Sequence, residues 1–461
     1  MNINCKPTTF QQKNIVSHAH QLDSTHIFNL LTGDVLFEEI ESLLPKHRER
    51  FFPPTETLSM FITQALSADK SCQKIVNDKA INQCINGLTL SSTHTGGYCR
   101  ARQRLPLEMV TQLTRFLGSH IEQQSEPGWL WQDRHIKVVD GTTVTMPDTA
   151  LNQVEYPQQS GQKEGLGFPI CRLVGVTSLS SGALLDLAVG YYKGKGGDEQ
   201  TLLRSMQDGF TKGDLLLGDA YYPTYFFLAD MRLKGVDLLM EQNGSRRKTA
   251  DFKKGKSLGT NDHIFTSKKP KKRPCWMSQE RYDAMVNELQ IREFKVGKKI
   301  LVTTLMNSKT YPSKALNKLY KSRWNIELDI RNIKTTMGMD ILSCKTPEMA
   351  LKEIWVYCLA YNLIRLLMLQ SALLSNIIPR QISFKHSLQV GLTLATQTHP
   401  LSDEMMIQFL VLIAQQTVGH RPGRVEPRAL KRRQKHFPLL TKPRGQARQD
   451  IMTNGHAKKL K

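Results

Sequence analysis

Four side chains with the chemistry to act on a phosphodiester lie close together in the segment YKSRWNIELDIRNIK. They are Tyr320, Arg323, Glu327 and Lys334. In a regular α-helix, which turns 100° per residue, they would lie at roughly 0°, 300°, 340° and 320°, on one narrow stripe. One carboxylate held beside a phenol and two cations suits a site where a metal ion and a phosphodiester meet. The alternative interpretation is a surface helix whose charges pair with one another.

The same segment carries apolar residues that would orient such a helix. Ile326, Ile330 and Ile333 fall on an adjoining face and are predicted to pack on a core. Trp324 lies about 40° from the stripe, on the side opposite the isoleucines, and we expect it to pack against this helix as well. The four polar residues are therefore predicted to stand on a buttressed helix.

Two aspartates occupy positions from which they can join Glu327. Asp140 ends the apolar run IKVV, and Asp219 ends LLLG. Carboxylates at the ends of neighbouring core strands can converge on one point without being buried unpaired. Each aspartate alone is weak evidence, because such residues commonly cap turns or helices. Together with Glu327 they offer three oxygen donors of the kind that hard divalent cations prefer.

This donor set predicts two-metal phosphodiester chemistry. Two Mg²⁺ ions about 3.5–4 Å apart activate a water and stabilise the leaving oxygen of an in-line displacement. The motifs of competing chemistries are missing. The glycine-rich segment GYYKGKGGDEQ (190–200) has no Gly-Lys-Ser/Thr ending, and the chain has neither a Gly-x-Ser-x-Gly nor a His-Glu-x-x-His motif.

The elements that must position the aspartates belong to a region that begins near residue 135. Here β-rich runs alternate with helical segments, and Ser180-Ser181-Gly182 separates two of the runs as a hairpin turn. We expect a mixed α/β sheet with helices packed on it. The predicted strands are HIKVVDGTTVTM, PICRLVGVTSL, ALLDLAVGYY, DLLLGD and VDLLMEQ, and the predicted helices are DEQTLLRSMQDGF and PTYFFLADMRLKG.

Basic charge dominates the composition. The chain has 461 residues and a formal net charge of +22, which favours polyanionic partners, nucleic acid before an anionic membrane surface. Residues 246–273 contain eleven Lys or Arg against two acids. We interpret this block and a second hairpin around Gly297 as an insertion that clamps the DNA backbone, the alternative being a solvated loop. The tail from His420 holds thirteen Lys or Arg and is expected to be extended, ordering on nucleic acid.

The N-terminal region is predicted to be a small helical DNA-binding domain. ETLSMFITQAL and LEMVTQLTRFLGSHI have helical periodicity, and Arg100, Arg102 and Arg104 lie between them. Ordinary surface charge is the alternative for these arginines. Near the other end, LKEIWVYCLAYNLIRLLMLQSALL is predicted to be a buried helix.

The apolar runs and the cysteines favour a reducing cytosol. The most apolar run, 354–369, carries Asn362 and Arg365 and is expected to fall short of a membrane span. The N-terminus lacks the apolar stretch of a secretory signal. Eight cysteines are scattered without a Cys-x-x-Cys pair, which argues against zinc and against a disulfide framework.

On these residues, the chain resembles the insertion-sequence-four family of bacterial DDE transposases. Tyr-x2-Arg-x3-Glu-x6-Lys matches the family signature at every spacing, and VDGTT and GDAYY match its two aspartate regions. Ala220 departs from the pattern, because many members carry an arginine there, and a local phosphate contact is in doubt. Further matching segments are LLPKHRERFFPPTETLSMFITQAL, GGYCRARQRLP, SCKTPEMALKEIWVYCLAYNLIR and RPGRVEPRALKRR.

The resemblance implies a ribonuclease H-like core in which Asp140, Asp219 and Glu327 are the catalytic, metal-binding triad. Two Mg²⁺ ions are the implied cofactors, with Mn²⁺ able to substitute. The implied domains are a helical N-terminal domain (1–125), a catalytic core (130–345) interrupted by a basic β-rich insertion (243–308), and C-terminal helices with a basic tail (346–461).

It also implies that the signature cations and phenol contact the DNA backbone near the cut. An aromatic of the insertion would stack on a flipped base, and Trp276 is the candidate, against the alternative of an ordinary core or surface tryptophan. The residues expected to contact DNA are Tyr320, Arg323, Arg331, Lys334, Trp276, Arg100, Arg102 and Arg104.

The resulting functional hypothesis is a cut-and-paste transposase of the bacterial cytoplasm, nucleoid-associated when DNA-bound. It would nick double-stranded DNA at the inverted-repeat ends, form and reopen a hairpin there, and join the ends to target DNA. Pairing two ends implies a homodimer in the synaptic complex. The alternatives are an inactive or self-inhibiting DNA-binding relative and a two-metal nuclease without strand transfer.

Overall fold

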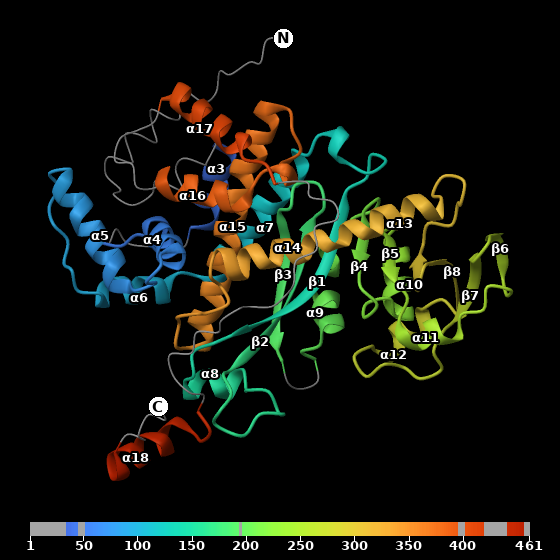
Figure 1. Cartoon of the computed structure of the whole chain (residues 1–461), viewed down its shortest axis with the longest axis horizontal. Helices are drawn as coiled ribbons and strands as arrows, with labels where there is room; N and C mark the ends of the chain where they lie inside the picture. The colour runs from blue at the N-terminus through green and yellow to red at the C-terminus, as the bar shows by residue number, and fades with distance from the viewer. Residues whose placement is uncertain (1–33, 45–50, 193–195, 395–401, 419–439, 456–461) are drawn as a thin grey trace, which may run out of the picture.

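A mixed sheet of nine strands runs through the described part of this computed structural model, which comprises residues 34–44, 51–192, 196–394, 402–418 and 440–455. The strand order is β3-β2-β1-β4-β5-β9-β8-β7-β6 (Figure 1). Helices lie on both faces of the sheet, so the predicted mixed α/β class is confirmed.

Strand β1 organises one half of the sheet. It pairs antiparallel with β2, which turns through the predicted hairpin into β3, and it pairs in parallel with β4, which continues to β5. The β1–β4 pairing covers only Ile136 to Val138, whereas the β1–β2 pairing continues to Thr145. Between Val138 and Thr145, which forms a bridge with Ile341, no described strand pairs with the β4 side of β1, and Asp140 lies in this open interval. The bounds are β1 (Ile136–Thr145), β2 (Ile170–Ser178), β3 (Leu184–Tyr191), β4 (Leu215–Gly218) and β5 (Asp237–Glu241).

The basic block continues the same sheet, since β9 pairs antiparallel with β5 and is followed by β8, β7 and β6. This block is more regular than its sequence predicts, because buried polar pairs replace the apolar alternation. Arg292 donates to Asp262 at 2.8 and 2.6 Å, and buried Glu293 accepts from Arg246 at 2.9 Å. The elements are α11 (Gly244–Thr249), β6 (Lys256–Gly259), β7 (Asp262–Lys268), α12 (Gln279–Ala284), β8 (Glu288–Val296) and β9 (Lys299–Thr303).

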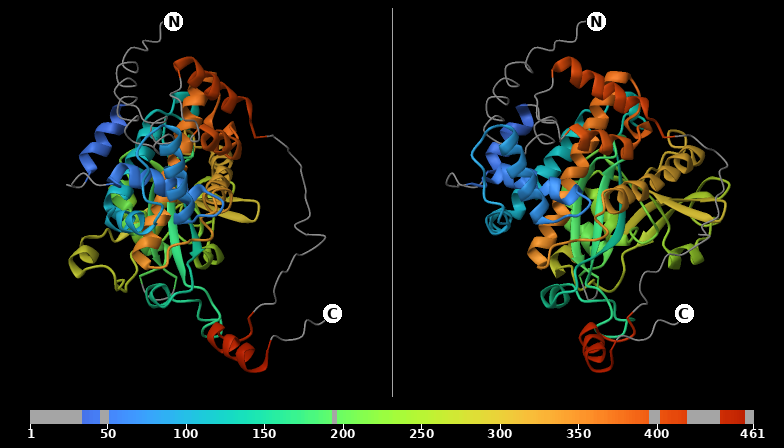
Figure 2. Two further views of the ribbon diagram at one scale, coloured as in Figure 1. Left: turned by 90° about the vertical axis from the view of Figure 1, so that its left-hand side faces the viewer. Right: turned by 60° about the vertical axis from the view of Figure 1, so that its left-hand side comes forward.

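Helices from the two ends of the chain share one apolar core. Side chains of α4 and α7 pack with those of α15, α16, β2 and β3, and Figure 2 shows these helices gathered at one end of the molecule. The regions predicted as separate N-terminal and C-terminal units are thus joined in space. The helices are α3 (Asp34–Leu43), α4 (Pro54–Leu66), α5 (Cys72–Ile85), α6 (Gly96–Arg104), α7 (Leu107–Gln123), α15 (Pro347–Ser375), α16 (Phe384–Leu394), α17 (Asp403–Gln415) and α18 (Arg444–Asn454).

The long helix α15 is the centre of that core. By length and composition it is apolar enough to cross a membrane, although the sequence predicted that it would fall short, and 78% of its apolar window is buried inside the protein. Its polar residues have protein partners: the Asn362 amide donates to the carbonyls of Thr114 and Leu184 at 2.9 and 2.8 Å. In this structure α15 is therefore a buried core helix whose polar groups are hydrogen-bonded within the protein.

The opposite face of the sheet is covered by shorter helices. A second apolar cluster joins α9 and α10 to Val139, Val174 and Leu216 of the central strands. These helices are α9 (Glu199–Ser205) and α10 (Tyr225–Leu233), and α8 (Ala150–Glu155) lies beyond the end of β1.

The serines at 180 and 181 lie in the predicted β2–β3 turn, where Gly182 adopts a φ of 78°.

The signature segment crosses the sheet as a helical rod of changing pitch (Figure 1). A 3₁₀ turn and a π turn interrupt the α-helix, so the regular 100° spacing does not hold across the four signature residues. Ile326 and Ile333 are buried and Ile330 packs against the core, as predicted. The parts are α13 (Ser313–Lys321), the 3₁₀ turn η3 (Ser322–Trp324), α14 (Asn325–Arg331) and the π turn η4 (Asn332–Thr336).

Candidate active site

Arg323 brings the strand acid and the helix acid together. It donates from Nη1 to Asp140 Oδ2 at 3.1 Å and from Nη2 to Glu327 Oε1 at 2.8 Å. Burial alone would lower the pKa of Arg323, but the charges of Asp140, Tyr320 and Glu327 together raise it. The guanidinium thus stays protonated and links β1 to α14.

Asp140 is largely shielded from solvent and lies near other carboxylates. Its side chain is 18% exposed, and one oxygen accepts from the Gly141 backbone N–H at 2.9 Å. Burial raises the pKa of Asp140, Arg323 and the Gly141 amide lower it, and the nearby charges of Asp219 and Glu327 raise it again. The net pKa is raised, so Arg323 does not fully compensate for burial and for the neighbouring acids.

Asp219 follows directly after β4, the parallel neighbour of β1. Its Oδ1 accepts from the Tyr221 backbone N–H at 2.8 Å, which fixes the turn that leaves the strand. Its charge raises the pKa values of Asp140 and Tyr222. The three predicted acids therefore face a common region at the open edge of β1.

The donor set suits a hard divalent cation, although the acids are not gathered as a finished site. Within the described ranges, no three His, Cys, Asp or Glu side chains lie close enough together to hold a metal ion. The reason is visible in the geometry, because the Arg323 guanidinium lies between Asp140 and Glu327. Three partly exposed carboxylates against one arginine leave a negative excess that a divalent cation would neutralise once this guanidinium turned away.

A fourth acid, Glu199 of α9, lies beside the triad and was missed by the sequence analysis. A Cβ added to Gly141 would lie 2.5 Å from either of its carboxylate oxygens, so Glu199 rests against the backbone next to Asp140. It accepts from the Tyr222 hydroxyl at 3.1 Å, and burial raises its pKa, helped by Asp219. The only signal in the sequence was its position at the end of the glycine-rich segment 190–200.

The other two signature residues are turned toward the protein. Tyr320 is buried in the core beneath β1 and β4, and burial raises its pKa. Lys334 donates to Thr142 Oγ1 at 3.1 Å and to the Thr143 carbonyl at 2.6 Å, and its partial burial lowers its pKa. Both side chains therefore attach the signature segment to the sheet in this structure.

The prediction that Trp324 packs against the signature helix is wrong, because its side chain is 53% exposed. It belongs to the 3₁₀ turn η3, where the angle expected for a regular helix does not apply. An exposed indole therefore stands next to Arg323.

The remaining predicted DNA contacts differ in exposure. Arg100, Arg104 and Arg331 are exposed. Arg102 is buried: it donates to Gln64 Oε1 at 3.0 Å and lies over the Phe61 ring, so it is a core residue of the N-terminal helices. The expectation that it contacts DNA is therefore wrong.

Trp276 is half-exposed at the outer side of α10. Arg204 lies over its ring at 4.2 Å from the ring centroid, and Phe226 forms a T-shaped contact with it at 6.2 Å between centroids. Trp276 is therefore not a buried core residue, and the ring face under Arg204 is not available for stacking on a base.

Comparison with known proteins places the chain among transposases. Residues 131–363 match the family model of the transposase DDE domain. Over 355 residues the chain is 28% identical to transposase InsG for insertion sequence element IS4 of Escherichia coli (strain K12), covering 74% of this chain and 78% of that protein. A cryo-EM structure of the piggyBac transposase synaptic complex with hairpin DNA aligns at 9% identity and a TM-score of 0.42, over 88% of this chain and 87% of that one. The chain belongs to the insertion-sequence-four family of DDE transposases, and it is a transposase enzyme.

Proposed function

We propose that this transposase cuts the ends of its own DNA element with Asp140, Asp219 and Glu327 as its catalytic acids. The observation that carries the proposal is the double ion pair of Arg323, which joins an acid of β1 to an acid of α14. Asp140 and Glu327 are far apart in the chain. A surface helix whose charges pair only with one another would not form an ion pair with a central strand, as Arg323 does with Asp140.

A ribonuclease H-like core is the fold that this arrangement favours. Strand β2 runs antiparallel to both of its neighbours, β1 and β3, while β4 and β5 run parallel to β1. The acids stand on β1, after β4, and on a helix packed across the same strands. The basic block at 243–308 then extends the sheet from β5 outward.

Asp140 and Asp219 are the residues that would hold a divalent cation, with Glu327 completing the set. We propose two Mg²⁺ ions, for which Mn²⁺ can substitute. When bound, such ions supply an activated water and stabilise the leaving oxygen. The protein's own contribution is to hold the carboxylates at the open edge of β1 and to provide Arg323, which is free to meet a phosphate once it leaves the acids.

The DNA contacts follow from exposure and charge. We propose that Arg323, Arg331, Arg100 and Arg104 contact the DNA backbone, and that Trp276 contacts a base after Arg204 moves aside. Tyr320 and Lys334 would support the site from below. The full route would be hairpin formation at the ends, cut-and-paste release and strand transfer to target DNA by a homodimer that is nucleoid-associated when bound.

The test is end cleavage by isosteric variants. Asp140→Asn, Asp219→Asn and Glu327→Gln should each abolish metal-dependent cleavage of inverted-repeat ends while retaining end binding, because each removes a charge and keeps the shape. Cleavage by Glu327→Gln at the wild-type rate would refute the assignment. A strand-transfer assay with pre-cut ends distinguishes the transposase from a nuclease that never joins strands.

A further inference from the structure

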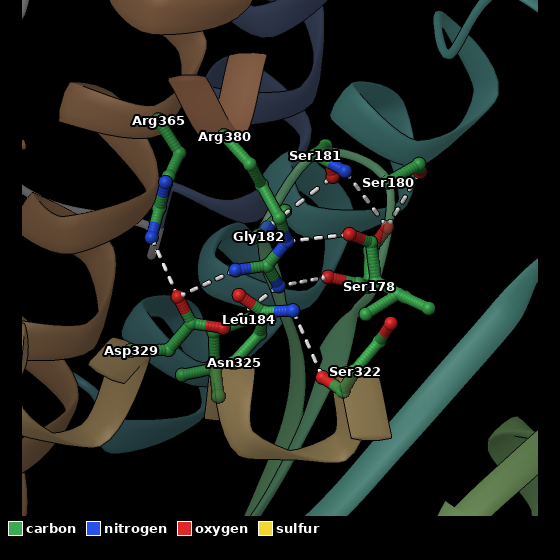
Figure 3. Close-up of polar contacts among 12 residues, drawn as sticks. Ser178, Ser180, Ser181, Gly182, Leu184, Ser322, Asn325, Asp329, Arg365 and Arg380 are labelled. Atoms are coloured by element: carbon green, nitrogen blue, oxygen red, sulfur yellow. Dashed lines mark hydrogen bonds and ion pairs between the residues drawn. The ribbon is translucent and has the colours of Figure 1, made fainter. Parts of the chain in front are cut away.

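A buried ion-pair cluster lies behind the helix that carries Glu327 (Figure 3). Asp329 is fully buried on α14, and its Oδ1 accepts from Arg365 Nη2 at 2.6 Å and from Arg380 Nη1 at 3.1 Å. Its Oδ2 accepts from Arg380 Nη2 at 2.9 Å. One carboxylate thus has both oxygens occupied by two guanidinium groups, which fixes its direction as well as its charge.

The two arginines come from elements outside the signature segment. Arg365 stands on α15, donates to the Tyr361 hydroxyl at 2.8 Å, and fills the space above Gly182 in the β2–β3 turn. Arg380, in the short helix η5 (Pro379–Gln381), donates to the Ser178 carbonyl at 2.6 Å and to that of Leu179. The cluster therefore joins α14 to the end of β2.

This connection leads to the other side of the active site. Ser178 of β2 pairs with Lys137 of β1, on the same strand as Asp140. On the helix, Asp329 and Glu327 are two residues apart, a rotation of about 200°. The helix is thus anchored at its rear to the strand pair that carries the acid at its front.

The anchor formed by Asp329, Arg365 and Arg380 matters because, under the proposed function, Arg323 must leave Asp140 and Glu327 before a metal ion binds them. In the described residues, Glu327 has one hydrogen-bond partner, Arg323, which also lies between the acids. When Arg323 turns away, the polar contacts that still hold the signature segment include the Asp329 cluster and Lys334, beside the packing of the buried Ile326 and Ile333. Apolar residues of similar volume would serve plain stability as well as a buried ion pair, but they would not fix a rotation.

We propose that Asp329 is a positioning residue of the catalytic centre. Held by Arg365 and Arg380, it sets the rotation of α14 about its axis and hence where the Glu327 carboxylate lies relative to Asp140. This proposal rests on the proposed function, since it assigns a role to Glu327.

The informative variants weaken the anchor, and Arg380→Met does so without leaving the buried Asp329 carboxylate unpaired. Arg380→Met removes the forked contact and the two carbonyl contacts, while the Asp329–Arg365 pair remains intact. Asp329→Asn is the companion variant, and Arg380→Lys replaces Arg380→Met if the latter does not fold. The matched control is Asp262→Asn, which breaks a comparably buried pair with Arg292 between strands β7 and β8. Neither Asp262 nor Arg292 is among the proposed DNA contacts.

The measurements separate positioning from stability. A displacement of about 1 Å in a catalytic group lowers rates on the order of a hundredfold. We expect Arg380→Met and Asp329→Asn to lower single-turnover cleavage by about that factor, with unchanged end affinity and faster hydrogen exchange over 325–331. Asp262→Asn should lower the melting temperature to a similar extent and cleave its bound ends at the wild-type rate.

Two results would overturn the proposal. One is wild-type single-turnover cleavage by folded Arg380→Met or by its Arg380→Lys replacement. The other is a loss in Asp262→Asn equal to that in the anchor variants, which would reduce the effect to stability. Glu327→Gln, assayed in parallel, distinguishes a failure of this proposal from a failure of the catalytic assignment.

Discussion

At the scale of single residues, the site depends on how closely four carboxylates approach one another. Asp140 and Glu327 share Arg323, the charge of Asp219 raises the pKa of Asp140, and Glu199 lies against the backbone of Gly141. A side chain at position 141 would occupy the place of the Glu199 carboxylate, so the absence of a Cβ at this position is a requirement of the site.

Gly141→Ala is therefore expected to lower end cleavage by tenfold or more, on the order of the losses that follow small misplacements at an active site. The added methyl forces Glu199 away from the strand and changes the charge balance at Asp140. Gly175→Ala is the matched control, because Gly175 pairs with Asp140 on β2 and its Cβ would meet Leu184 at an ordinary 3.4 Å. Equal cleavage rates in the two variants would contradict this reading.

Lys334 yields a prediction about stability. Lys334→Met removes the hydrogen bonds to Thr142 and Thr143 and should lower the free energy of unfolding by about 1–2 kcal/mol. Chemical denaturation measures this change. A variant with wild-type stability and weakened end binding would instead make Lys334 a direct DNA contact.

At the scale of elements, the contact between α7 and β1 carries a pH dependence. His135, just before β1, has a raised pKa because it pairs with Glu122 of α7, an effect that partial burial opposes. A raised folded-state pKa means that this stabilisation is complete below the ordinary value of 6.5 and is lost as the pH rises through the folded value.

The melting temperature of the wild type should therefore fall, relative to His135→Gln, as the pH rises from below 6.5 to above it. The variant lacks the titrating group, so the difference between the two curves isolates this pair. A constant difference across that range would show that the pair contributes nothing.

The same scale shows how far the sequence predicts this structure. Strands with apolar runs, such as IKVV and LLLG, were predicted because their burial is local and visible in the letters. Strands β6 and β7 were not assigned from the sequence pattern, because neither has an apolar run. Most of β6 is exposed, and β7 buries Asp262 and His263, which are paired with Arg292 and Glu293 of β8.

The site shows the same limit. The spacing of the signature singled out Glu327 as a candidate. The ends of two apolar runs singled out Asp219, which follows β4, and Asp140, which lies within β1 and not at its end. The exposure of Trp324 and the burial of Arg102 depend on a 3₁₀ turn and on neighbours far along the chain. The roles of Glu199 and Asp329 could not be predicted from the sequence either, because only tertiary packing brings their partners to them.

At the scale of the whole molecule, we predict that net charge contributes strongly to DNA affinity. The segment from His420 onward has thirteen Lys and Arg, and their binding to phosphates would release counterions. Truncation at His420 should weaken binding to all DNA sequences and flatten the dependence of affinity on salt, measured by titration at several ionic strengths. An unchanged salt slope would show that the tail does not contact DNA.

The continuity of the sheet has a geometric consequence. From β4, beside the acids, to the outermost strand β6 there are five strand spacings, or about 24 Å, the length of about seven base pairs. Because every neighbouring pair of strands is hydrogen-bonded, loop changes do not alter that span. We predict that DNA in contact with both the acids and β6 would be held at two points about seven base pairs apart.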